Sequence, residues 1–148
     1  MSRVHKIIAS CFGIGHLKGG GTVAAAACCG ALLLMPAGID NGVMLLLSLI
    51  ITDIGVWSAS GVEGEWGKDS SRVVIDEVAG MCISVLFIPL TWVTIAVAFI
   101  LFRAFDILKP LYIRRLEAVP GGWGVMLDDL AAGIYANIVM QIFVRYML

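Results

Sequence analysis

The fold is decided by the stretch Val78–Phe102, VAGMCISVLFIPLTWVTIAVAFILF, which is the longest apolar run in the chain. This run is long enough for one membrane-spanning helix, which needs about 20 apolar residues. Pro89 interrupts the run, however, and Thr91 is a good residue to cap the start of a helix. We therefore favour a hairpin of two helices over a single span. The first helix would run over 72–88 with Ser71 as its cap, and the second over 92–108.

Three further apolar segments flank this hairpin, namely Thr22–Met35, Val43–Ser58 and Leu130–Leu148. Hydrophobic residues make up 60% of the 148 residues and charged residues 14%, against about 45–50% and about 25% in soluble domains. A chain this short cannot bury so much apolar surface in its own core. We expect a single domain over residues 1–148, an all-α integral membrane bundle of about five helices. A soluble oligomer is the alternative.

The distribution of positive charge supports five crossings. With a cytoplasmic N-terminus, nine of the ten Lys and Arg residues face the cytoplasm and only Arg145 faces outward, as the positive-inside rule requires. A single crossing at 78–102 would instead carry Arg103 and Lys109 to the outside. The sequence thus predicts a multi-pass protein.

The short first helix of the hairpin places a site at the cytoplasmic interface. From Asp76 to Ile88 it would span about 18 Å at ~1.5 Å per residue, less than the roughly 30 Å hydrocarbon core. We therefore expect Asp76 and Glu77 to lie at the level of the lipid headgroups, where they could reach a lipid without extracting it.

Acidic residues fall at three places of matching depth. Asp76 and Glu77 are near the start of the third expected helix, Asp106 is near the end of the fourth, and Asp128 and Asp129 open the fifth. Charged groups in a membrane are costly and usually face a cavity with a partner. Five converging carboxylates would need a cation, and hard oxygen ligands favour Mg²⁺. The alternative is that each acid only caps a helix or marks the interface.

Two basic side chains flank Asp106, and a glycine run precedes the first apolar helix. Arg103 lies one turn before Asp106, on the same helix face, and a guanidinium can bind a phosphate bidentately; Lys109 follows closely. A snorkelling cation or a simple ion pair is the alternative for Arg103. The run Gly19–Thr22 would present backbone N–H groups to an anion, although such a run is more often only a loop.

The sequence lacks the residues that nucleic-acid binding and other hydrolase mechanisms require. A net charge of −1 offers no basic footprint for nucleic acid. None of the four cysteines is followed by an arginine six residues on, so the cysteine phosphatase loop is absent. The two histidines, His5 and His16, make no credible Ser/His/Asp set, and no Asp-x-Asp pair provides a phosphoaspartate site. A metal–carboxylate hydrolase is what remains.

Several motifs together resemble the phosphatidylglycerophosphatase A family over nearly the whole chain. They are Phe12–Gly15 (FGIG), Gly21-Thr22, Asp69–Gly80 (DSSRVVIDEVAG), Phe102–Pro110 (FRAFDILKP) and Gly121–Gly133 (GGWGVMLDDLAAG). The resemblance implies an all-helical, Mg²⁺-dependent phosphatase of the bacterial cytoplasmic membrane that makes phosphatidylglycerol from phosphatidylglycerophosphate. It also implies metal or catalytic roles for Asp76, Glu77, Asp106, Asp128 and Asp129, with Arg103 and Lys109 beside them. The loop His16–Ala25 departs from the family's P-x-x-P-G-T-x-G-S pattern, so only Gly21 and Thr22 are carried over as substrate-binding residues.

The mechanism we expect follows from these residues. One or two Mg²⁺ ions held by the carboxylates would bind the terminal phosphate, and Arg103 and Lys109 would neutralise its remaining charge. A carboxylate, such as Asp76 or Glu77, would accept a proton from the attacking water. A broader lipid phosphate phosphatase, a membrane cation carrier and a non-catalytic helical scaffold are the alternatives. The expected partners are the lipid substrate and the bilayer, with the oligomeric state left open.

Overall fold

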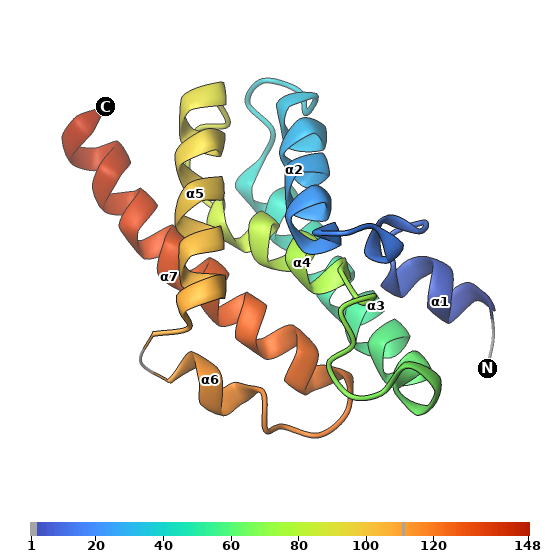
Figure 1. Cartoon of the computed structure of the whole chain (residues 1–148). Helices are drawn as coiled ribbons and strands as arrows, with labels where there is room; N and C mark the ends of the chain where they lie inside the picture. The colour runs from blue at the N-terminus through green and yellow to red at the C-terminus, as the bar shows by residue number, and fades with distance from the viewer. Residues whose placement is uncertain (1–2, 111) are drawn as a thin grey trace.

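The computed structural model describes residues 3–110 and 112–148, and all of the regular structure in these residues is helical (Figure 1). The all-α prediction is therefore confirmed. Seven α-helices are present in the described part of the chain, where we expected about five, because two short helices, α1 and α6, were not foreseen. The elements are α1 (Arg3–Ala9), a 3-10 turn (Ile14–His16), α2 (Gly20–Leu33), α3 (Asn41–Trp66), α4 (Ile75–Ser84), α5 (Trp92–Leu108), α6 (Ile113–Leu116) and α7 (Gly122–Met147).

The predicted break in the long apolar run is confirmed. The chain leaves the helical conformation after Ser84 and re-enters it at Trp92. Thr91 caps α5 as expected, because its hydroxyl accepts the Thr94 N–H at 3.2 Å while the Thr94 hydroxyl accepts the Thr91 N–H at 2.9 Å. This reciprocal pair satisfies two N–H groups that would otherwise have no partner at the helix start.

The first helix of the hairpin is shorter than predicted. Val74, and not Ser71, is the residue before α4, and the helix ends at Ser84, four residues before Ile88. Side chains from α7 compensate for this early end. Asn137 donates to the Ser84 and Leu86 carbonyl oxygens at 3.2 and 2.8 Å, and Gln141 donates to the Leu86 carbonyl at 3.0 Å. In apolar surroundings such partners are required, since an unsatisfied carbonyl is costly.

Helices α3 and α7 are both longer than their apolar segments suggested. Asp40 caps α3 by accepting the Gly42 and Val43 N–H groups at 2.8 and 3.2 Å, and the helix continues eight residues past Ser58. Helix α7 begins at Gly122, so Asp128 and Asp129 do not open it but lie in its second turn. The C-terminal part of α3 and the N-terminal part of α7 are polar in sequence, so we did not expect them to be helical. Tertiary contacts stabilise the helical conformation in both places.

Helix α4 lies at the centre of the molecule, in contact with α2, α3, α5 and α7 (Figure 1). Its crossing with α7 is close because two glycines meet there. A Cβ on Gly133 would lie 2.4 Å from the Gly80 carbonyl oxygen, and a Cβ on Gly80 would lie 2.5 Å from the Phe102 ring. Small residues at a crossing let two helix backbones approach. This crossing brings the acidic residues of α4 and α7 to one place.

Two helices, α3 and α7, are long and apolar enough to cross a membrane, judged by length and composition. Helix α2 is apolar but shorter. Large apolar side chains of α3, such as Leu46, Leu49 and Ile50, are exposed rather than buried in the bundle. These observations indicate association with a membrane, while the predicted five crossings are not confirmed.

Candidate metal centre and phosphate site

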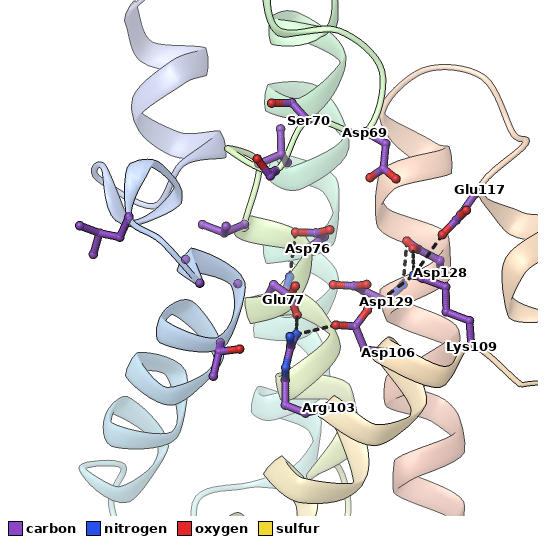
Figure 2. Close-up of a pocket in the computed structure, with 18 of the residues that line it drawn as sticks. Asp69, Ser70, Asp76, Glu77, Arg103, Asp106, Lys109, Glu117, Asp128 and Asp129 are labelled. Carbon is purple, nitrogen blue, oxygen red and sulfur yellow. Dashed lines mark hydrogen bonds and ion pairs between the residues drawn. The ribbon is translucent and has the colours of Figure 1, made fainter.

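All five predicted acids line one cavity of about 430 Å³. They come from three helices: Asp76 and Glu77 from α4, Asp106 from the last turn of α5, and Asp128 and Asp129 from α7 (Figure 2). Four of the five side chains are buried, and Glu77 is half-buried. The three acidic stretches of the sequence therefore converge, as their matching depth predicted.

Asp129 is the residue that links the acids into one cluster. One oxygen each from Asp76, Asp128 and Asp129 lie within 4.8 Å of one another, and so do oxygens of Glu77, Asp106 and Asp129. Among the described residues, the Asp129 Oδ2 atom is buried and has no hydrogen-bond partner. Burying an unpaired carboxylate oxygen is strongly unfavourable. A divalent cation would be coordinated by this oxygen, and the all-oxygen donor set suits a hard ion.

The two basic side chains predicted for the site, Arg103 and Lys109, form ion pairs with these acids. Arg103 donates to Glu77 Oε2 at 2.6 Å and to Asp106 Oδ2 at 2.5 Å, as Figure 2 shows. This confirms that Arg103 and Asp106 share a helix face. The guanidinium bridges α4 and α5 and lies at the cavity wall, where a phosphate could also reach it.

Lys109 ends α5 with a left-handed backbone conformation (φ 46°) that directs the chain toward α6. Its Nζ atom lies 2.6 Å from Asp128, 3.1 Å from Glu117 and 3.7 Å from Asp106. Burial alone would lower the pKa of Lys109, but the hydrogen bond and charge of Asp128, with Glu117 and Asp106, raise this pKa above its ordinary value. The side chain is therefore cationic at neutral pH.

The start of α2 forms another wall of the cavity, which includes the predicted residues Gly21 and Thr22. A Cβ on Gly21 would lie 2.5 Å from Glu77 Oε1, so a glycine leaves room for that carboxylate. Gly19, in a left-handed conformation (φ 71°), precedes the helix and provides no side-chain cap. The first N–H groups of a helix have no intrahelical acceptor, so this wall can bind an anion.

Three further charged residues that the sequence reasoning did not select also line the cavity, namely Lys18, Asp69 and Glu117. Asp69 is the first residue of the motif DSSRVVIDEVAG and has a left-handed backbone conformation (φ 54°). Its place in that motif could have identified it as a candidate site residue. No sequence motif indicated Glu117, because its position in the cavity depends on the course of the chain between α6 and α7. In total the lining carries seven carboxylates and three cationic side chains. A phosphate would be repelled from such a cavity unless metal ions neutralised it.

The fold and the cavity together define an all-helical protein with a candidate metal centre at the crossing of α4, α5 and α7. The model of the phosphatidylglycerophosphatase A family matches residues 7–144. The chain therefore belongs to that family.

Curated relatives carry related names. A protein of Bacteroides thetaiotaomicron, provisionally named a phosphatidylinositol-3-phosphatase, is 46% identical over 100 residues, covering 65% of this chain and 62% of the relative. The phosphatidylglycerophosphatase A of Haemophilus influenzae is 38% identical, covering 72% of this chain and 67% of the relative. The phosphatidylglycerophosphatase A of Escherichia coli is 37% identical, covering 55% of this chain and 49% of the relative. No solved structure matches the chain.

Proposed function

We propose that this protein is a Mg²⁺-dependent phosphatase that converts phosphatidylglycerophosphate to phosphatidylglycerol. The observation that carries the proposal is a cluster of five carboxylates that share Asp129, whose buried Oδ2 atom has no hydrogen-bond partner among the described residues, in a chain of this family. Ion pairs alone do not explain the cluster, because Arg103 and Lys109 leave Asp129 Oδ2 without a hydrogen bond.

Asp76, Glu77, Asp106, Asp128 and Asp129 are the residues that would hold Mg²⁺, since each places a carboxylate oxygen in one of the two groups around Asp129. When bound, the ion supplies charge neutralisation for the phosphate and makes water a better nucleophile at neutral pH. The fit rests on an all-oxygen donor set, which suits Mg²⁺ better than a softer metal.

The remaining steps use the side chains of the cavity. Arg103 turns from Glu77 and Asp106 to donate to the phosphate oxygens, and Lys109, at the end of the same helix, neutralises further charge. Gly21 and Thr22 donate backbone N–H groups to the same anion. Asp76 or Glu77 accepts a proton from the water that attacks phosphorus. The bond between phosphorus and the glycerol oxygen breaks, a proton reaches that oxygen, and inorganic phosphate and phosphatidylglycerol leave.

The location follows from the same proposal. We place the single domain in the bacterial cytoplasmic membrane, with α3 and α7 among its crossings and the cavity facing the cytoplasm. The exposed apolar surface of α3 supports the membrane, and the orientation rests on the positive-inside rule applied to the five crossings expected from the sequence. A cation carrier would need acids spread through the depth of the bilayer, whereas here they gather in one cavity.

A broader lipid phosphatase is the second candidate. The relative provisionally named a phosphatidylinositol-3-phosphatase favours it, since it shares 46% identity over 100 residues. Both lipids carry a phosphate monoester on a polyol, so one cavity could accept either.

The test is phosphate release by the purified protein in detergent micelles. We expect release from phosphatidylglycerophosphate, loss of activity with EDTA, and a fall of orders of magnitude for Asp129→Asn. Glu63→Gln is the matched control, because Glu63 lies on α3 and does not line the cavity. Full activity in EDTA would refute the metal, and faster release from phosphatidylinositol 3-phosphate would favour the second candidate.

A further inference from the structure

The lining of the cavity has one exposed apolar side chain among the described residues. Three apolar side chains line it, and of these Val73 and Val74 are buried, whereas Leu17 is 56% exposed. Phe12, five residues earlier in the same connection, is 87% exposed. We call Phe12 and Leu17 the apolar rim.

The turn that presents Phe12 is well defined. Phe12 and Cys11 both have left-handed backbone conformations (φ 59° and 49°), which are unfavourable for such residues. Hydrogen bonds hold the turn: the Phe12 N–H donates to the Ile7 carbonyl at 2.8 Å, and the Gly13 N–H donates to the buried Ser10 hydroxyl at 3.1 Å. The fold therefore fixes a large aromatic side chain outside its own core, where water would solvate it poorly.

Helix α1, which precedes this turn, packs against α3 near the end of the exposed apolar surface of α3. The His5 ring contacts the Trp57 ring with centroids 4.0 Å apart, and Trp57 is the last of the exposed apolar side chains of α3. Eight residues further along α3, Glu65 pairs with Lys6 at 2.5 Å. Helix α1 therefore lies across α3 at the point where the apolar surface of α3 gives way to charged residues (Figure 1). Tryptophan is enriched where a membrane meets water, so Trp57 is consistent with such a boundary.

We propose that the apolar rim contacts the acyl region of the lipid layer and is the path by which the tails of a bound lipid leave the cavity. This rests on the proposed function, and it identifies the side of the cavity that faces the membrane. Leu17 belongs to both the cavity lining and the rim, so a headgroup in the cavity has its tails over Leu17 and then Phe12. The exposed cation Lys18, next to Leu17, matches the anionic headgroup region.

Photocrosslinking tests the contact without using activity. The photoreactive residue benzoylphenylalanine replaces Phe12, and in a second protein it replaces Lys68, which is exposed in the connection between α3 and α4. Each protein is reconstituted into vesicles of phosphatidylethanolamine and phosphatidylglycerol and irradiated. Mass spectrometry should find lipid adducts at position 12 and few at position 68. Equal yields at the two positions would overturn the proposal.

Kinetics test the path. Leu17→Gln and Phe12→Gln should each raise KM about tenfold for long-chain phosphatidylglycerophosphate diluted in mixed micelles, because apolar contact with the tails is lost, and should leave kcat unchanged. For a short-chain analogue dissolved as monomers, KM should change little. Leu34→Gln is the matched control, since Leu34 is also 87% exposed but lies at the other end of α2. An unchanged long-chain KM in both rim variants would contradict the path. Adducts at position 12 without phosphate release by the unaltered protein would refute the phosphatase and leave the membrane contact standing.

Discussion

The crossing of α4 and α7 gives the sharpest prediction, because it links packing to the site through a single methyl group. In Gly133→Ala the new Cβ would lie 2.4 Å from the Gly80 carbonyl oxygen, whereas ordinary contact begins at 3.4 Å. The helices must therefore separate by about 1 Å at this point. Such overpacking costs about 1–3 kcal/mol of stability. Asp129 lies one helical turn from Gly133, so the separation also moves the carboxylates, and a 1 Å displacement can lower a rate about 100-fold.

The assay pairs phosphate release with thermal unfolding in the same detergent. Gly30→Ala is the control, because a Cβ added at this position on α2 would meet no neighbouring atom within 4 Å, and alanine is favoured over glycine in a helix by about 1 kcal/mol. Gly133→Ala should lose both stability and activity, while Gly30→Ala should keep its activity and gain stability. A fully active Gly133→Ala protein would refute the view that this crossing sets the geometry of the site.

Three smaller predictions concern individual contacts. Asn137→Leu removes donors to the Ser84 and Leu86 carbonyls, and should lower the free energy of unfolding by about 1–3 kcal/mol, measured by denaturant titration in micelles. Arg103→Lys keeps the charge but loses the forked geometry that reaches Glu77 and Asp106; kcat/KM should fall about tenfold or more, and an unchanged value would exclude a phosphate contact. Gly21→Ala places a methyl group against Glu77 Oε1; because that side chain can move, activity should fall while the melting temperature stays close to that of the unaltered protein.

Local signals in the sequence were sufficient for several features. Pro89 and Thr91 indicated the break in the apolar run. Proline has no backbone N–H group and the threonine hydroxyl caps a helix start, and both effects depend only on residues close by in the sequence. The convergence of the acids could be predicted as well, since charges at matching depth in an apolar chain need a shared polar cavity.

Features that depend on distant contacts could not be predicted. Helix α4 can end at Ser84 because Asn137 and Gln141, more than fifty residues away, donate to the carbonyls of Ser84 and of Leu86 just beyond the helix. Helix α7 begins at Gly122 because that glycine packs against α3, where a Cβ would lie 2.3 Å from the Val56 carbonyl oxygen. Glu117 joins the cavity only through the path of the chain after α6. No pattern within these segments reports such contacts.

The proposed metal centre is tested by measuring whether a divalent cation binds to the carboxylate cluster. Mn²⁺ can stand in for Mg²⁺ in electron paramagnetic resonance, where the free ion gives a signal that weakens on binding. We predict that the purified protein binds Mn²⁺, that Mg²⁺ displaces it, and that Asp129→Asn abolishes the binding while Glu63→Gln preserves it. Binding that is equal in the Asp129→Asn and unaltered proteins, or absent from both, would contradict a metal centre built on Asp129.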